Sequence, residues 1–183
     1  MFNTMRRFTI LSILLAQATE LEAINFPFEA IQLTNTDVAN FSAISFGSPY
    51  GQNISSNQVQ CKAFPGSEDW PSDSLWNRFN ESIGGALLKP FPLGAYCYPG
   101  PYYNAATCRY LVTLGGFTRL YLNDPLATLT QWTEGNTCVA ALNAKGNCTQ
   151  GGFPVYVVNA TTVKHVQAAV NFARNNNIRL VIK

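Results

Sequence analysis

Five cysteines and one histidine are the residues of this 183-residue chain whose types could support redox or metal chemistry. Cys97 and Cys108 flank the turn-rich loop YPGPYYNAAT, and Cys138 and Cys148 flank VAALNAKGN. A disulfide that closes a loop of this size stabilises a protein by about 2–3 kcal/mol in the chain-entropy estimate. The spacing favours these two local pairs, although sequence alone does not fix cysteine connectivity. The two pairs would leave Cys61 without a partner.

Metal binding is the alternative use of these residues. A structural zinc site needs closely spaced thiolate and imidazole ligands, but the chain contains no CxxC pair and His165 is its only histidine. His165 lies in a helix-like stretch between Lys164 and Val166, which is typical of an ordinary helix residue rather than of a catalytic base. We therefore assign no catalytic, cofactor-binding or metal-binding residue from the sequence.

The first 18 residues have the pattern of a cleaved secretory signal. Arg6 and Arg7 give a positive start, a largely apolar run follows from Phe8 to Ala16, and Ala16-Gln17-Ala18 fits the small-x-small cleavage site. The run is far shorter than the roughly 20 apolar residues that a membrane-spanning helix needs. A buried N-terminal helix is the alternative. The pattern predicts a secreted protein without a membrane anchor.

Glycosylation signals and cysteine usage agree with secretion. Paired cysteines are typical of an oxidising compartment, and only 12% of the residues are charged, so the chain needs another source of solubility. N-linked glycans would provide it, since Asn-x-Ser/Thr is the acceptor pattern in secreted proteins. The pattern occurs five times, at Asn40, Asn53, Asn80, Asn147 and Asn159.

The charge balance argues against a nucleic-acid partner. The chain has 12 basic and 10 acidic residues, and cleavage after Ala18 would remove Arg6 and Arg7 and leave ten of each sign. Proteins that bind nucleic acids carry a basic patch that neutralises phosphates. No such patch is visible in the sequence, so we do not expect a nucleic-acid partner.

Helix signals flank the first pair of cysteines. Residues 19–60 are rich in Asn, Ser and Thr without a sustained helical period, which predicts a polar extended arm. Residues 72–85 predict a helix with Ser72 as N-cap and a Gly-Gly end. Residues 104–116 predict a second helix with Asn104 as cap, and Asp124-Pro125 begins a short third one, since proline suits the first helical position.

The last part of the chain alternates strand and helix signals. Residues 153–159 and 178–183 are rich in β-branched residues, and 161–177 lie between them with helical spacing. Thr161 or Thr162 can cap this helix, and Asn175 to Asn177 can take the left-handed turn at its end. We expect Val163, Val166, Val170 and Ala173 on the buried face of that helix. Strand, helix and strand at this spacing predict a βαβ unit with two parallel strands and a right-handed crossover. The fold class is therefore predicted to be α+β.

These same residues carry a family resemblance. The tail FPVYVVNATTVKHVQAAVNFARNNNIRLVIK resembles the start of the FAD-binding domain of the p-cresol-methylhydroxylase (PCMH) type, found in the vanillyl-alcohol-oxidase (VAO) and berberine-bridge-enzyme relatives. The upstream part is similar to secreted fungal members of that superfamily. The similar features are Cys61, Trp70-Pro71-Ser72, Trp76 with Gly84-Gly85, and the two cysteine loops, so that the resemblance covers about residues 60–183.

The chain departs from the family pattern in two ways. Ala63 and Asp69 stand where family members often have cysteines, which is consistent with one disulfide being absent altogether. In the family, the strand that corresponds to 178–183 runs into a loop such as Asn-Thr-Gly-His-Asp, which wraps the flavin pyrophosphate and often carries the covalent flavin bond. The present sequence stops before such a loop, so the domain that starts at 151 is expected to be truncated.

The resemblance implies the N-terminal part of a secreted FAD-dependent oxidoreductase that oxidises a small alcohol-like substrate, with oxygen as acceptor. It divides the chain into a signal peptide (1–18), the polar arm (19–60), a helical disulfide-containing region (61–150) and the start of the FAD-binding domain (151–183). FAD is expected in the full-length family but not bound by this chain alone. The alternatives are a non-catalytic secreted glycoprotein or binding module, whose loop YCYPGPYYN could stack on sugars, and an inactive fragment.

Overall fold

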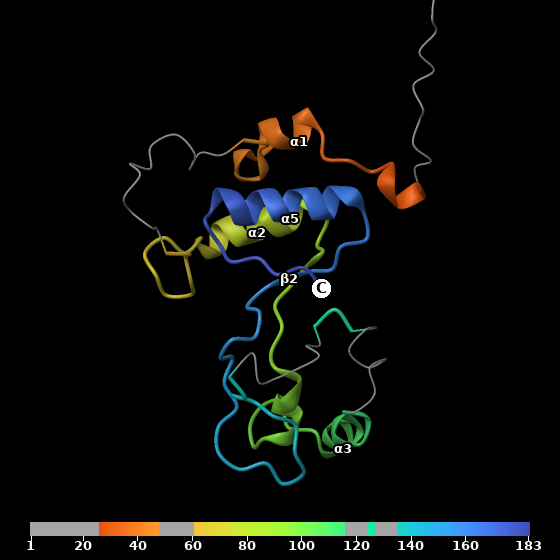
Figure 1. Cartoon of the computed structure of the whole chain (residues 1–183), viewed down its shortest axis with the longest axis vertical. Helices are drawn as coiled ribbons and strands as arrows, with labels where there is room; N and C mark the ends of the chain where they lie inside the picture. Colours follow the sequence, from red (N-terminus) through yellow and green to blue (C-terminus); the bar gives the residue numbers. More distant parts are fainter. Residues whose placement is uncertain (1–25, 48–60, 116–123, 127–134) are drawn as a thin grey trace, which may run out of the picture.

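The computed structural model in Figure 1 describes residues 26–47, 61–115, 124–126 and 135–183. The predicted signal at 1–18 and the sequon at Asn53 lie outside these residues. The described elements are, in chain order, η1 (Pro27–Glu29), α1 (Asn35–Asn40), η2 (Ser42–Ile44), α2 (Asp73–Ser82), β1 (Leu87–Leu88), η3 (Leu93–Cys97), α3 (Ala105–Leu114), β2 (Val157–Val158) and α5 (Val163–Asn175).

The three longer helices begin and end close to the predicted residues. The side chains of Ser72, Asn104 and Thr162 each accept a hydrogen bond from the backbone N–H three residues later, which caps α2, α3 and α5. Gly84 follows α2 with a φ of +64°, and Asn177 follows α5 with a φ of +52°. These left-handed residues end the helices as their types predicted.

Aromatic side chains pack α2 against α5. The ring centroids of Phe79 and Phe172 lie 4.2 Å apart in a stacked arrangement, and those of Trp76 and Tyr156 lie 4.0 Å apart. Trp76 also contacts Phe172 at 4.9 Å. Residues 26–47, 70–88 and 156–178 surround this cluster, and we call them the helical lobe. Residues 89–115 and 135–154 form a second part, the loop lobe, drawn below it in Figure 1.

The predicted extended arm is wrong for residues 26–47, which fold into η1, α1 and η2. Thr34 and Asp37 form a reciprocal capping box at the start of α1: Asp37 N–H donates to Thr34 Oγ1, and Thr34 N–H donates to Asp37 Oδ2. Phe41 and Ile44 are buried in the core of the helical lobe. A few apolar residues are enough to hold this segment in place, because it packs against a longer helix.

That helix is α5, which lies between the N-terminal segment and α2 (Figure 1). Its polar side chains bond the backbone of residues 33–45. Asn171 Nδ2 donates to the carbonyl of Ile44 at 3.0 Å, and Asn175 Nδ2 donates to the carbonyls of Ala43 and Ser45 at 3.0 Å each. Asn171 and Asn175 are themselves buried, so each of these bonds satisfies a group that water does not reach.

The predicted buried face of α5 is wrong for Val166 and Val170, whereas Ala173 is buried and Val163 is half-buried. Val166 and Val170 are 46% and 36% exposed, while Ala168 and Phe172 are buried. The helix contacts protein on two sides, through Phe172 towards α2 and through Asn171 towards η2, so its buried arc includes polar positions. A valine period identifies an apolar stripe, but it does not decide which stripe faces the neighbouring helix.

The predicted βαβ unit does not form. β1 and β2 pair antiparallel, with Leu87 opposite Val158 and Leu88 opposite Val157. Within 178–183 only Ile178 makes a bridge, a parallel one with Ala63. A strand is defined by backbone pairing with a neighbour, and in the described part of the chain β2 pairs with β1 rather than with residues 178–183. Over the described residues the result is a mixed helical fold with a small two-stranded sheet.

The region after α3 is described only in part. The predicted third helix at Asp124-Pro125 falls on residues 124–126, where Pro125 and Leu126 form a turn, and its continuation lies outside the described residues. Asp124 Oδ1 accepts a hydrogen bond from the N–H of Leu126 at 2.8 Å. This is the bond of an Asx-turn, which an aspartate before proline favours as readily as a helix start.

The Asp37–Lys164 ion pair gives the first test of the contact between α1 and α5. Lys164 Nζ donates to Asp37 Oδ1 at 2.7 Å, and both side chains are about a quarter exposed. The hydrogen bond from Lys164, and then those from Thr34, lower the pKa of Asp37 from 3.8 to about 2. Replacing Asp37 by Asn should reduce the free energy of unfolding by about 1 kcal/mol at neutral pH, because the pair is partly solvated and the cap persists in part.

The pH dependence follows from the lowered pKa. The contribution of the carboxylate is fully present above the ordinary pKa of 3.8 and is lost as the pH falls through about 2. Urea unfolding of the wild-type chain and Asp37→Asn should therefore give a constant stability difference down to about pH 4 that shrinks below it. Asp69→Asn, at an exposed aspartate, is the control. An equal loss in both variants would contradict the role of the ion pair.

Candidate functional site

Two disulfides organise the loop lobe. Cys97 bonds Cys108 with Cα atoms 4.8 Å apart, which ties the end of η3 to α3. Cys138 bonds Cys148 with Cα atoms 4.4 Å apart and closes the loop between them. These are the pairs that the spacing favoured. Cys138 is fully buried beside Ala95 and Phe153, so its disulfide is the centre of the small core of this lobe.

A glycine permits the close packing of that core. A methyl group on Gly94 would lie 2.1 Å from the carbonyl oxygen of Cys138 and 3.1 Å from the backbone nitrogen of Ala140. No Cβ atom tolerates such distances, and the neighbouring groups are backbone that cannot move aside cheaply. Gly94 therefore lets η3 lie directly on the chain that leaves Cys138. The sequence pattern gave no reason to single out this residue.

The surface of the loop lobe contains an aromatic hollow of about 690 Å³, which we call the loop hollow. The rings of Phe91 and Tyr102 stack there with centroids 4.0 Å apart, and Tyr96 meets Phe91 edge-on. The Tyr98 hydroxyl donates to the carbonyl of Val139 and so fixes that ring. Residues that line the hollow include Lys89, Phe91, Tyr98, Tyr102, Asn147 and Gln150.

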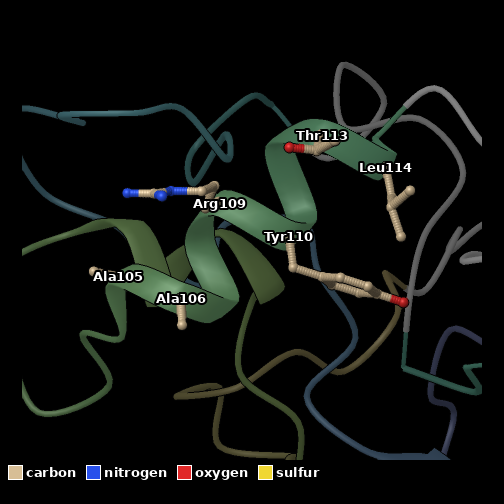
Figure 2. A pocket seen from close by; sticks show the side chains of 6 residues that line it. All are labelled: Ala105, Ala106, Arg109, Tyr110, Thr113 and Leu114. Carbon is tan, nitrogen blue, oxygen red and sulfur yellow. The ribbon is translucent and has the colours of Figure 1, made fainter.

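A second, open hollow of about 630 Å³ lies along α3 (Figure 2). Figure 2 shows Arg109 and Tyr110 extending in opposite directions from the helix, with Thr113 on a later turn. The side chains do not converge on one point, which a reaction site would require. The lining residues are Ala105, Ala106, Arg109, Tyr110, Thr113 and Leu114.

The other residues that the sequence singled out have structural partners. Nδ1 of His165 accepts a hydrogen bond from the N–H of Thr161 at 3.2 Å, so the ring helps to close the start of α5. Cys61 is exposed and makes no disulfide, and its carbonyl accepts a hydrogen bond from Asn177. Ala63, where family members often have a cysteine, is buried and bridges Ile178.

Four of the five sequons lie in the described residues. Asn40, Asn147 and Asn159 are exposed, whereas Asn80 is half-buried and its Oδ1 accepts a hydrogen bond from the N–H of Leu87. An acceptor asparagine needs an accessible side-chain nitrogen, so the three exposed positions are the more accessible ones. Asn147 differs from the other two because it also lines the loop hollow.

The described residues contain neither a group of metal ligands nor a membrane-spanning helix. Within residues 26–47, 61–115, 124–126 and 135–183, no three His, Cys, Asp or Glu side chains are grouped closely enough to hold a metal ion. Over the same ranges, no helix has the length and apolar character needed to cross a bilayer.

Comparison with known proteins identifies relatives of one kind. No family model matches the chain. The bifunctional decalin synthase calF of Penicillium decumbens is 36% identical over 127 residues, covering 68% of this chain and 22% of that protein. The VAO-type flavoprotein oxidase VAO615 of Thermothelomyces thermophilus is 33% identical over 67% of this chain and 22% of its own length. The FAD-linked oxidoreductase patO of Aspergillus clavatus is 35% identical over 67% of this chain and 21% of its own.

Solved structures give the same answer. The crystal structure of the VAO-type flavoprotein MtVAO615 from Myceliophthora thermophila matches with a TM-score of 0.59 and 33% identity over 68% of this chain and 23% of that one. MtVAO713 from the same fungus matches with a TM-score of 0.58 and 30% identity over 66% of this chain and 22% of that one. The chain belongs with the VAO-type FAD-linked oxidoreductases. It spans about a fifth of the length of the curated relatives that it matches.

The disulfides of the loop lobe lead to a direct test by thiol counting. With two disulfides and an unpaired Cys61, one thiol per molecule should react with a thiol reagent when the chain is unfolded without reduction. The double variant Cys97→Ala/Cys108→Ala should lose about 2–3 kcal/mol of stability, since it opens a closed loop. Cys61→Ala is the matched control and should leave stability unchanged. Three or more free thiols in the wild-type chain would contradict this disulfide map.

Proposed function

We propose that this chain forms the N-terminal, disulfide-bearing portion of a secreted FAD-dependent oxidoreductase that oxidises a small alcohol-like substrate. The observation that supports it most is the match to a VAO-type flavoprotein at 33% identity and a TM-score of 0.59 over 68% of the chain. Similarity of sequence and of backbone over the same part makes a shared fold by chance very improbable. The cysteines and sequons support the secreted character.

At the start of α5, backbone N–H groups that a flavin pyrophosphate could use are already bonded within the chain. Flavin pyrophosphate commonly binds free backbone N–H groups at a helix N-terminus. In α5 the N–H of His165 donates to Thr162 Oγ1, and the N–H of Lys164 donates to the carbonyl of Ile31. Among the described residues, the one buried side-chain nitrogen or oxygen without a partner is Trp76 Nε1, which lies inside the aromatic core. We therefore assign this segment a scaffolding role and derive no catalytic step from it.

Exposed apolar side chains support that role. Val181 and Ile182 are 76% and 77% exposed, and Val166 and Val170 on α5 are also exposed. Exposed aliphatic residues that are neighbours in sequence, such as Val181 and Ile182, are expected where another part of a protein covers them. In the proposed oxidoreductase this cover is the remainder of the flavoprotein, because the relatives are between four and five times as long as the part that matches.

A non-catalytic secreted binding module is the second candidate. The loop hollow, with its stacked Phe91 and Tyr102, is the feature that would support it. The hollow carries no ligand-specific arrangement of polar groups, and every relative compared above by sequence is a synthase, an oxidase or an oxidoreductase. The oxidoreductase is therefore the better supported of the two.

Flavin retention tests the proposal. The purified 183-residue chain, mixed with excess FAD and passed through a desalting column, should keep no visible flavin absorption. The full-length protein that contains this segment should carry the absorption of oxidised flavin. Stoichiometric flavin on the isolated chain would overturn the scaffolding role, and a flavin-free full-length protein would overturn the assignment as a flavoprotein.

A single substitution can distinguish a role of Val181 in covering contacts of the full-length protein from a role in the stability of the isolated chain. Val181→Asp should leave the stability of the isolated chain within about 0.5 kcal/mol, because the side chain is 76% exposed there. In the full-length protein the same change should reduce flavin content or folding yield, since it buries a charge. Lys145→Asp, at an exposed position of the loop lobe, is the matched charge-changing control and should affect neither. If both variants had equal effects, the proposal that the rest of the full-length protein covers Val181 would be wrong.

A further inference from the structure

The loop hollow has a fixed aromatic face that is only half covered. Tyr102 stacks on Phe91 with an angle of 13° between the rings, yet its residue remains 49% exposed. One face of the ring packs on Phe91, and about half of the residue's surface remains accessible on the hollow. The Cys138–Cys148 disulfide and the Tyr98–Val139 hydrogen bond hold the surrounding loops in place. A ligand that binds to an exposed ring on a rigid support loses little entropy in ordering the protein. Such a ring suits a flat ligand with apolar C–H groups.

A ligand of this kind can be attached at the rim. Asn147 is exposed, lines the same hollow as Tyr102 and begins the sequon Asn147-Cys148-Thr149. Pyranose rings present a face of C–H groups that stacks on aromatic rings, and their hydroxyl and acetamido groups remain free for water and polar side chains. A sugar linked to Asn147 is held close to Tyr102 at high effective concentration, so even a weak contact is populated.

The other described sequons lack this arrangement. Asn40 and Asn159 are exposed, but neither lines the loop hollow. Asn80 is half-buried, and its Oδ1 accepts the N–H of Leu87. Among the described acceptors, Asn147 is thus the one that is exposed and also lines the loop hollow.

We propose that Asn147 carries an N-linked glycan whose first sugar packs on the exposed surface of Tyr102 and covers the loop hollow. The glycan then acts as part of the loop lobe, where it covers the surface beside the small buried cluster of Ala95, Cys138 and Phe153. This inference rests on the proposed secretion, since only a chain that enters the secretory pathway meets the glycosylation machinery.

The experiment measures glycan occupancy and its coupling to Tyr102. The full chain is produced in yeast behind the host's own secretion leader, so that its entry does not depend on residues 1–18. Occupancy at each sequon is read by mass spectrometry after enzymatic deglycosylation in heavy-oxygen water. Asn147 is expected to be occupied in the secreted chain. A secreted chain that is unmodified at Asn147 overturns the inference while leaving secretion itself intact.

Two substitutions remove the sequon and the aromatic ring separately. Thr149→Ala abolishes the sequon and preserves the backbone bond from Thr149 N–H to the carbonyl of Thr137, whereas Thr149→Ser keeps the sequon as a matched control. We expect Thr149→Ala to lower Tm by about 2–4 °C. Tyr102→Ala should remain glycosylated, and adding Thr149→Ala to it should lower Tm no further, because the contact is already lost.

The comparison with a second sequon completes the test. Asn159→Gln removes an acceptor at an exposed site outside the hollow, and its effect on Tm should simply add to that of Tyr102→Ala. If Thr149→Ala and Tyr102→Ala are also additive, the glycan does not pack on Tyr102 and the inference is wrong. A Thr149→Ser variant that behaves like Thr149→Ala would likewise overturn it, since the loss would then come from the protein and not from the sugar.

Discussion

The stack of Phe172 on Phe79 is the contact on which the helical lobe depends. It fixes the rotation of α5 about its own axis. Successive residues of an α-helix lie about 100° apart around that axis, so the direction of one side chain sets the direction of the next. With Phe172 directed to α2, Asn171 necessarily faces the N-terminal segment and bonds the carbonyl of Ile44. The packing of α1 and η2 is thus a consequence of an aromatic contact on the other side of the same helix.

The two lobes reach stability by different physical means. The helical lobe buries aromatic rings and satisfies its buried amides, as a small domain must when its core is modest. The loop lobe adds two disulfides to its buried residues, and Gly94 allows η3 to lie close to the chain that leaves Cys138. The disulfides stabilise this lobe by constraining the unfolded chain.

Local signals in the sequence predicted local structure well. The caps Ser72, Asn104 and Thr162 defined the starts of three helices, because a capping side chain acts within three residues of itself. Non-local facts were missed. The valine period on α5 did not reveal which face is buried, and the β-branched run at 178–183 did not reveal that β2 pairs with β1. Both depend on partners far away in sequence.

The candidate site shows the same division. Loop length favoured the two disulfide pairs because both close over short distances, whereas the loop hollow combines residues from 89–102 and 146–150 that only folding brings together. The assignment as an oxidoreductase depends on family resemblance and not on the geometry of a site, because the described helix starts do not present a flavin-binding arrangement. In each of α2, α3 and α5 one first-turn N–H bonds the capping side chain, and in α5 the N–H of Lys164 also donates to the carbonyl of Ile31. A segment that uses its helix termini for its own folding suits the support of a flavin site better than the binding of the flavin phosphates.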